Sequence, residues 1–375
     1  MSRAREFADL AGSADAGGLT GRNLIINGAM QVAQRGTSFA QAGGATTYNF
    51  AIDRFKYEQA IEQWAGTMSQ STDVPSSLDA SFKYSLKIQT TTVETTIDAD
   101  DFAQIVYYFE GNDGERLAYG TSNARVSTLS FYVRSSVTGT YCLGLSNQDG
   151  SRTLPLEYTV SVADTWQRIE LTVPACIDGT WGTGSNKHLG IRWMLGKPGT
   201  NFDGGTNGVW ASDSGYAKLY TDQSNMVDWL RTASSTLYIT GVQLEVGEQA
   251  TPFEHEPFET TEKKCFRYFQ RRSNSSGYSI MGSGGHWVNA TTPKVPVFLH
   301  PRMRAAPTFS SAGSIHYVYG AGLLAASTAT PTLSDNNTGW SGLINGTTAS
   351  VGTTGDHTRI QTNNAAGNID FDAEL

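Results

Sequence analysis

The stretch LYITGVQLEVGEQATPFEHEPFETTEKKCFRYFQ, residues Leu237–Gln270, decides how the rest of the chain is organised. Its apolar side chains first fall on odd positions, at Leu237 and Ile239, and then on even positions from Val242 onward. The phase changes at Gly241, and a glycine at such a change is typical of a β-bulge. We therefore expect a closing strand that bulges at Gly241 and pairs with an earlier part of the chain.

The second half of this stretch mixes acidic and basic residues around aromatic ones, which is typical of a connector between two domains. We expect a short helix in it, around Glu259–Gln270. The chain then has four parts. They are an N-terminal tether (1–22), a jelly-roll domain (23–253), a connector (254–272) and a small C-terminal β domain (273–375).

The composition favours an all-β fold. Hydrophobic residues make up 39% of the 375-residue chain and charged residues only 17%, which excludes the highly charged composition of disordered chains. The chain has 40 glycines and 11 prolines without a repeating Gly-x-y period, which indicates many tight turns between short strands.

Short alternating segments separated by Asn, Gly and Asp turns fill residues 23–253. In LGIRWML (189–195) every second residue is apolar, as in a half-buried antiparallel strand. FAQIVYYFE (102–110) is nearly all apolar and should be a central strand. NLIINGAMQV (23–32) should be the first strand, with a bend at Asn27. Strand count and turn density together predict a jelly-roll β-sandwich.

Charge and hydropathy limit the partners that the chain can have. The formal net charge of −8 and a pI of about 5.3 would repel a nucleic-acid backbone, so we expect no nucleic-acid partner. No apolar run approaches the roughly 20 residues that span a bilayer, so we expect no membrane insertion. The N-terminus lacks the apolar core of a signal peptide, which predicts synthesis and folding in the cytoplasm.

The three cysteines predict neither a disulfide framework nor a zinc site. They are odd in number, widely spaced and outside any C-x-x-C motif. We expect Cys142, Cys176 and Cys265 to be small buried hydrophobic residues.

Several motifs occur together and in a fixed order along the chain. They are NLIINGAMQVAQRG, TLSFYVRSSVTGTYCLGLSN, DTWQRIELTVP, DGTWGTG, YITGVQLEVGEQATPFEHEPF, CFRYFQ, RMRAAPT and the terminal IDFDAEL. This combination, which covers residues 23–375, resembles tail fibres and related virion appendages of tailed bacteriophages.

The resemblance implies a jelly roll like that of carbohydrate-binding modules, followed by a small β domain. It also implies a homotrimer that attaches to other virion proteins through its N-terminal segment (1–22) and meets host surface polysaccharide with its distal domains. Only some 20 residues precede the jelly roll, unlike the extended shaft of long fibres. This leaves open a short fibre, a spike or an adaptor.

Catalytic signatures are absent from the sequence. It contains no G-x-S-x-G, H-E-x-x-H or P-loop motif, and its six histidines lack ligand spacing. We therefore expect no catalytic residues, no metal-binding histidines and no cofactor. Asp98, Asp100 and Asp101 are adjacent carboxylates, for which a solvated turn is the favoured interpretation. An acid/base pair and a structural calcium site remain as alternatives.

Exposed aromatic residues beside amides and acids are the natural candidates for glycan binding, because a sugar ring stacks on them while its hydroxyls need polar partners. We expect these contacts from Trp210 with Tyr216, from Trp287 and from Trp340. The alternative for each tryptophan is packing beneath its loop or in a subunit interface.

The sequence thus predicts a noncatalytic structural component of a phage virion, a homotrimeric tail fibre or spike that attaches to host surface glycans. One alternative is an adaptor that links other tail or fibre components without binding glycan. A second is a polysaccharide depolymerase, since two acids brought together by the fold need no sequence motif.

Overall fold

The computed structural model describes residues 21–43, 47–273, 280–313, 315–319, 323–327, 329–334, 339–362 and 367–375. The chain divides into two compact units. Unit 1 is Met1–Thr261 together with Leu375, and unit 2 is Glu262–Glu374. The division falls inside the expected connector (254–272). Residues 1–20 of the expected tether lie outside the described residues.

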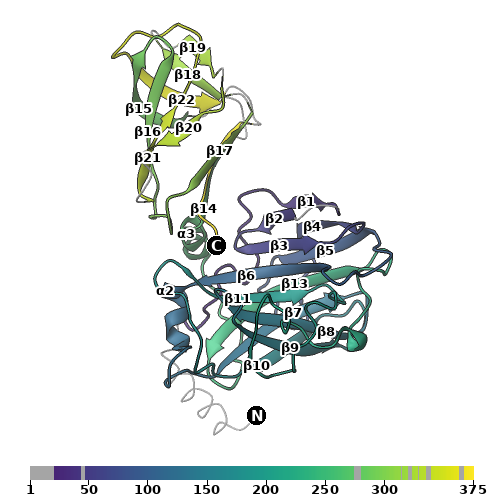
Figure 1. Ribbon diagram of the computed structural model, residues 1–375. Helices are drawn as coiled ribbons and strands as arrows, with labels where there is room; N and C mark the ends of the chain where they lie inside the picture. Colours follow the sequence, from purple (N-terminus) through teal and green to yellow (C-terminus); the bar gives the residue numbers. More distant parts are fainter. Residues whose placement is uncertain are drawn as a thin grey trace. The chain divides into compact units, whose positions relative to one another are not determined.

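Unit 1 is a sandwich of two antiparallel sheets, which confirms the jelly-roll β-sandwich (Figure 1). Sheet A has six strands in the order β1-β4-β5-β13-β7-β10. Its strands are β1 (Ser38–Gln41), β4 (Ala65–Ser71), β5 (Ser85–Thr92), β7 (Ser127–Ser135), β10 (Gln167–Val173) and β13 (Thr236–Val246).

Sheet B has seven strands in the order β12-β9-β8-β11-β6-β3-β2. They are β2 (Thr47–Ile52), β3 (Phe55–Ala60), β6 (Phe102–Glu110), β8 (Gly139–Asn147), β9 (Arg152–Val160), β11 (Lys187–Met194) and β12 (Ala211–Ser212). The nearly all-apolar β6 lies inside the sheet, between β11 and β3, as its composition predicts. Short helical turns complete the unit: α2 (Gly111–Gly114), η1 (Glu115–Leu117) and η2 (Gln223–Asn225).

The strand β13 confirms the interpretation of the phase change. It lies between β5 and β7, and its register with β7 shifts between Thr240 and Gln243. Gly241 has a φ of 61°, and a Cβ there would lie 2.7 Å from the rings of Phe82 and Tyr132. Both the backbone conformation and the space require glycine at this bulge.

Residues 23–32, expected as the first strand, do not form one. Asn27 and Met30 have φ values of 64° and 58°, and this conformation ends any extended run. The Asn27 side chain holds the bend, because its Oδ1 accepts hydrogen bonds from the N–H groups of Gln31 and Val32 at 2.9 and 3.0 Å. The Asn27 side chain thus bonds N–H groups that would pair with a neighbouring strand if this segment were extended.

The same segment is fastened to the last residues of unit 1. The Leu24 N–H donates to the Leu244 carbonyl of β13 at 2.9 Å. The Glu254 carboxylate accepts hydrogen bonds from the N–H groups of Gly21 and Asn23. The points where the chain enters and leaves the sandwich are therefore held together directly.

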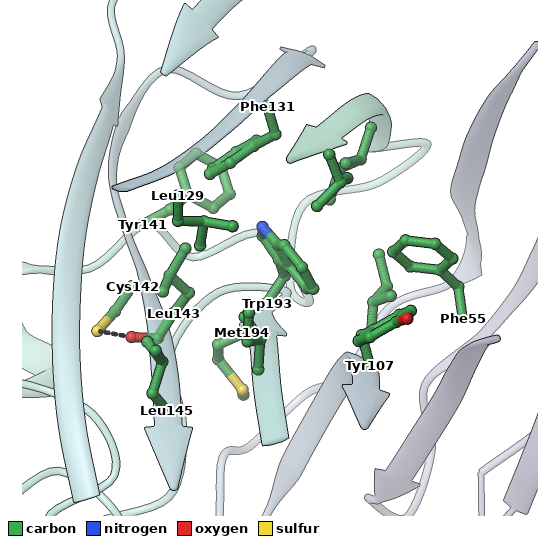
Figure 2. Packing of buried hydrophobic residues seen from close by; sticks show 14 of the residues in the cluster. Phe55, Tyr107, Leu129, Phe131, Tyr141, Cys142, Leu143, Leu145, Trp193 and Met194 are labelled. Atoms are coloured by element: carbon green, nitrogen blue, oxygen red, sulfur yellow. Dashed lines mark hydrogen bonds between the residues drawn. The ribbon is translucent and has the colours of Figure 1, made fainter. Parts of the chain in front are cut away.

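The core of unit 1 lies between the two sheets and is rich in aromatic residues (Figure 2). Trp193 of β11 is fully buried, with its ring centroid 5.9 Å from that of Phe131 on β7 and 6.3 Å from that of Phe55 on β3. The cysteines are free and buried, which confirms the expectation for Cys142, Cys176 and Cys265.

The expected connector helix is present but shorter than predicted. The helix α3 spans Phe258–Phe266, and the chain then turns into β14 (Phe269–Ser273). Phe269 and Tyr268 are buried, and the Ala373 N–H donates to the Tyr268 carbonyl at 2.8 Å. The helix ends at Phe266 because the residues from Phe269 onward pair with β23 as a strand.

Unit 2 is the smaller C-terminal β domain. Sheet C joins β14, β23 (Asn368–Asp372) and β17 (Thr308–Ala312) in that order. Sheet D has the order β19-β18-β22-β15-β16-β21-β20. Its strands are β15 (Ile280–Asn289), β16 (Thr292–Phe298), β18 (Ile315–Tyr319), β19 (Leu323–Ala326), β20 (Thr332–Ser334), β21 (Ser341–Asn345) and β22 (His357–Thr362).

Helices in the described parts of the chain are too short or too polar to cross a bilayer.

Candidate functional site

The outer face of sheet B, which points away from the sandwich core, carries a cluster of charged and aromatic side chains. Strand residues alternate between the two faces, so Tyr107 of β6 packs in the core while Tyr108 points outward. The same alternation turns residues of β3 and β11 to the outer face. The outer cluster consists of Lys56, Glu58, Tyr108, Lys187, Arg192 and Tyr216.

Arg192 is the centre of the outer cluster. Its side chain is only 3% exposed, and its Cζ lies 5.4 Å from the ring centroid of Tyr108 and 5.0 Å from that of Tyr216. Its Nη1 donates a hydrogen bond to Ser146 Oγ at 2.8 Å. Guanidinium groups keep their charge when buried, so the cluster holds a permanent cation between two tyrosine rings.

Glu58 forms the acidic side of the cluster. Its carboxylate lies 2.8 Å from the Lys56 ammonium and accepts a hydrogen bond from Gln104 Nε2 at 3.1 Å. The Gln104 amide oxygen in turn accepts a hydrogen bond from the Tyr220 hydroxyl. Glu58 and Gln104 are direct register partners of β3 and β6, so the strand pairing itself builds this network.

Lys187 carries a second cation at the start of β11. Its Nζ lies 4.6 Å from the ring centroid of Tyr108. Burial, together with the nearby charge of Arg192, lowers the pKa of the Lys187 ammonium to about 8. Lys187 is therefore mostly protonated at neutral pH, but it holds its proton weakly.

Tyr216 reaches the cluster from a loop that Asp213 organises. The Asp213 carboxylate accepts hydrogen bonds from the Lys218 N–H at 2.9 Å and from Thr153 Oγ1 of β9 at 2.8 Å. Tyr216 itself has a φ of 66°, which is uncommon for a residue with a large side chain. A strained residue held by its surroundings is typical of functional sites.

Two glycines leave room for the rings of the cluster. A Cβ at Gly190 would lie 2.9 Å from both the Tyr108 ring and Arg192 Nη1. A Cβ at Gly150 would lie 2.7 Å from the Tyr216 ring. Both tyrosine rings can therefore take these positions only because the residues beneath them are glycines.

Of the residues expected to contact glycan in unit 1, Tyr216 lies in the outer cluster and Trp210 does not. Trp210 is half-buried, and its Nε1 donates to the Pro174 carbonyl at 2.8 Å. Its ring packs edge-on against Trp181 and Tyr119, with centroids 5.6 and 5.9 Å apart. These contacts give Trp210 a packing role beneath its loop.

The other two expected residues lie in unit 2. Trp287 is fully buried, and a Cβ at Gly352 would lie 2.1 Å from its ring, so a sugar could reach it only if that loop moved. Trp340 is 48% exposed, with His300 at a centroid distance of 6.1 Å and Arg302 over its ring at 5.8 Å. Trp340 is thus the accessible one of this pair.

The adjacent aspartates form a turn. Asp101 Oδ2 accepts a hydrogen bond from the Asp98 N–H at 2.8 Å, and the Asp101 N–H donates to the Asp98 carbonyl at 3.2 Å. Burial raises the pKa of the Asp101 carboxyl, and the neighbouring acids add to this. Among the described residues, no group of three His, Cys, Asp or Glu side chains is placed to hold a metal ion.

Sequence reasoning did not single out Lys56, Glu58, Tyr108, Lys187 or Arg192. The sequence feature that could have identified them is a charged or aromatic residue at a position that faces away from the core in an alternating strand. Arg192 in LGIRWML and Tyr108 in FAQIVYYFE are such residues. Such a signal occurs in most half-exposed strands, and only the strand order brings these residues together.

No protein-family model matches the chain, and no curated protein matches it. Among solved structures, the enzymatically active domain of bacteriophage CBA120 tailspike protein 4 is similar over 60% of this chain and 22% of its own, with 11% identity and a TM-score of 0.31. TmCBM61, solved with β-1,4-galactotriose, is similar over 60% of this chain and 99% of its own, with 11% identity and a TM-score of 0.29.

A family 11 carbohydrate-binding module of Clostridium thermocellum is similar over 56% of this chain and 99% of its own, with 11% identity and a TM-score of 0.28. The matched part therefore spans less than a quarter of the tailspike chain but nearly all of each module. With scores this low, the function has to be argued from the residues of this chain.

Proposed function

We propose that this chain is a noncatalytic structural component of a bacteriophage virion, a homotrimeric tail fibre or spike that attaches to glycans on the host surface. The outer cluster carries the proposal of glycan binding. It gathers the rings of Tyr108 and Tyr216 with the guanidinium of Arg192 and the carboxylate of Glu58 on one sheet face. The resemblance of the sequence motifs to phage appendages supports the virion role.

Sugars need both kinds of group that this face offers. The apolar face of a pyranose stacks on an aromatic ring, while its hydroxyl groups exchange hydrogen bonds with charged and amide side chains. Tyr216 is half-buried, so one part of its ring is held by the cluster while another part stays accessible. The glycines beneath the rings let both side chains pack closely against the backbone, and a side chain that is already packed costs less to order when a ligand binds.

A glycan array carrying bacterial surface polysaccharides, probed with the full chain, tests this proposal. We expect Tyr216→Ala to weaken binding at least about tenfold, because the ring is a central contact. Trp340→Ala is the matched control, since it removes an exposed aromatic ring from unit 2. If Trp340→Ala abolishes binding and Tyr216→Ala leaves it intact, the glycan site is not the outer cluster.

The trimer is supported by apolar side chains that unit 2 leaves exposed. Ile280 is 60% and Phe298 is 63% exposed, and both line a surface hollow of about 300 Å³ with Pro296 and Met281. Exposed apolar patches often mark contacts between subunits. Light scattering should give three times the 40.4 kDa chain mass, and a monomer at micromolar concentration would contradict the trimer.

The location of this chain on the virus particle distinguishes a fibre or spike, which is exposed, from an adaptor, which is enclosed by other proteins. Antibodies against unit 2 should label the outside of intact virions at a tail or other appendage. If antibodies against both units bind only after the particle is dissociated, the chain is an adaptor enclosed by other virion proteins.

The absence of catalysis is also proposed and has a direct test. In the outer cluster, Glu58 is the one carboxylate, whereas glycoside hydrolysis by the usual mechanism needs a pair. Purified protein incubated with a bound polysaccharide should release no reducing ends. Their release would make the chain a depolymerase.

A further inference from the structure

We propose that the sugar bound by the outer cluster is an acidic one, whose anionic group lies against Lys187, with the buried charge of Arg192 behind it. This inference rests on the glycan binding proposed for the same site and specifies its ligand. The shared chemistry is a sugar that carries a carboxylate or a phosphate. Uronic acids and sugar phosphates both meet that description.

Two cations surround Tyr108 without a matching pair of carboxylates. Lys187 and Arg192 both lie over its ring, at 4.6 and 5.4 Å from the centroid. Among the residues that the structure describes, neither cation has a carboxylate within ion-pair distance. Two cations near each other in a partly buried site repel one another, and an anion between them would relieve this.

The remaining charged groups at this face do not neutralise the pair. The charge of Glu58 acts on both Lys187 and Arg192, but its carboxylate lies 2.8 Å from the Lys56 ammonium, which offsets it. Glu110, the register partner of Lys187, accepts a hydrogen bond from Asn112 Nδ2 at 2.9 Å. Asp149 acts on Lys187 from the β8–β9 turn, and its own carboxylate accepts a hydrogen bond from the Ser151 N–H at 3.0 Å.

Hydrogen bonds also fix Arg192 in place. Ser146 Oγ accepts a hydrogen bond from one end of the guanidinium, and the Tyr108 hydroxyl accepts a longer one, 3.4 Å, from Nη2. Because Arg192 is only 3% exposed, its guanidinium supplies a fixed positive charge behind Lys187 and not a direct contact with the ligand. Lys187 adds a more mobile charge, as the ammonium of a flexible side chain.

The test compares acidic polysaccharides with their own neutral forms. Full-length protein is titrated calorimetrically with polygalacturonate, alginate and a polysaccharide that carries phosphate monoesters as side groups. The two uronates are also tested after reduction of their carboxyl groups, and the third after removal of its phosphate. We expect binding to at least one acidic form, at least about tenfold weaker binding to its neutral form, and weaker binding in high salt.

Two lysine variants connect the binding to this site. Lys187→Met should weaken binding of the acidic form about tenfold and leave any binding of the neutral form unchanged. Lys87→Met is the matched control, because Lys87 also lies over a tyrosine ring, Tyr238, but on sheet A. It should leave both affinities unchanged.

The outcomes separate the two proposals. Equal affinity for acidic and neutral forms, with loss of both in Tyr216→Ala, overturns the acidic ligand but keeps glycan binding at the outer cluster. Binding of the acidic form that Lys187→Met does not change also overturns the acidic ligand. If neither form of any panel member binds, the acidic ligand is rejected, and the glycan array then decides on glycan binding itself.

Discussion

The outer faces of the two sheets in unit 1 each place a lysine and an arginine around one tyrosine, yet their surroundings differ. On sheet A, Lys87 and Arg134 lie 5.6 and 5.2 Å from the ring centroid of Tyr238. Arg134 forms ion pairs with Asp73 and Asp164. The arginine on this face therefore has two carboxylates beside it.

On sheet B, the corresponding residues are Lys187, Arg192 and Tyr108. Here Arg192 donates to neutral oxygens, those of Ser146 and Tyr108. Nearly the same geometry thus serves two ends. On sheet A the arginine completes an ion-pair network within the chain, and on sheet B the two cations have no carboxylate at ion-pair distance among the described residues. Both faces have cations and a tyrosine ring. What distinguishes the candidate site is that its arginine lacks a neighbouring carboxylate.

The largest expected effect comes from the glycine beneath Tyr108. Gly190→Ala places a methyl group 2.9 Å from the Tyr108 ring and from Arg192, so it should lower the free energy of unfolding by about 2 kcal/mol. Chemical denaturation measures this. The control on the other face is Lys87→Ala, beside Tyr238, which should change the stability by less than about 0.5 kcal/mol. Equal losses would show that the two faces are packed alike.

Removing each arginine tests the difference in carboxylates directly. Arg134→Met leaves Asp73 and Asp164 without their cation and should cost up to about 1 kcal/mol of unfolding free energy, because both carboxylates are partly exposed. Arg192→Met removes repulsion with Lys187 as well as a hydrogen bond to Ser146, so the two terms should offset to within about 1 kcal/mol. A larger loss for Arg192→Met than for Arg134→Met, in the same denaturation experiment, would contradict the comparison.

An effect of similar size but opposite sign is expected for Lys187. Because burial lowers the pKa of its ammonium to about 8, holding the proton in the folded state costs stability. Lys187→Met should therefore raise the unfolding free energy at pH 7 by about 1 kcal/mol, a value reduced for solvent screening of this partly exposed group. Lys87→Met should leave it nearly unchanged. A destabilised Lys187→Met protein would argue for an ion pair at this lysine.

The pH dependence should be the smallest effect. Between pH 8 and the ordinary lysine pKa of 10.5, the unfolded chain binds more protons at Lys187 than the folded one does, so stability rises with pH. The advantage of Lys187→Met over the unchanged protein should accordingly be complete below pH 8 and fade to nothing near pH 10.5. Denaturation curves at pH 7, 9 and 10.5 check this, and a constant advantage would mean that the pKa is not lowered.

Much of the fold could be predicted because it follows from local pattern. The change of phase at Gly241 located the bulge of β13, and the apolar run at 102–110 located an inner strand of sheet B. Residues 23–32 were wrongly expected to be a strand. Their apolar alternation resembles that of a strand, but the Asn27 side chain closes a turn whose hydrogen bonds the pattern does not reveal.

The candidate site could not be predicted in the same way. Tyr108 and Arg192 lie on adjacent strands but far apart in the sequence, and nothing local indicates that β6 and β11 pair. Nor does the sequence reveal which arginine meets an acid, since Arg134 pairs with an aspartate on a distant loop. Tyr216 was expected because its loop composition is itself a local signal. Trp210 has similar loop neighbours, yet its indole N–H bonds to Pro174.

The fastening of Gly21 and Asn23 to Glu254 has a mechanical consequence. A pull applied between residue 21 and residue 254 acts on two points that already touch, so the force passes through the Glu254 hydrogen bonds and barely loads the strands between them. The applied force would then bypass most of the strands of the sandwich. Tension between these two residues would leave the outer cluster on sheet B undistorted for as long as these bonds hold.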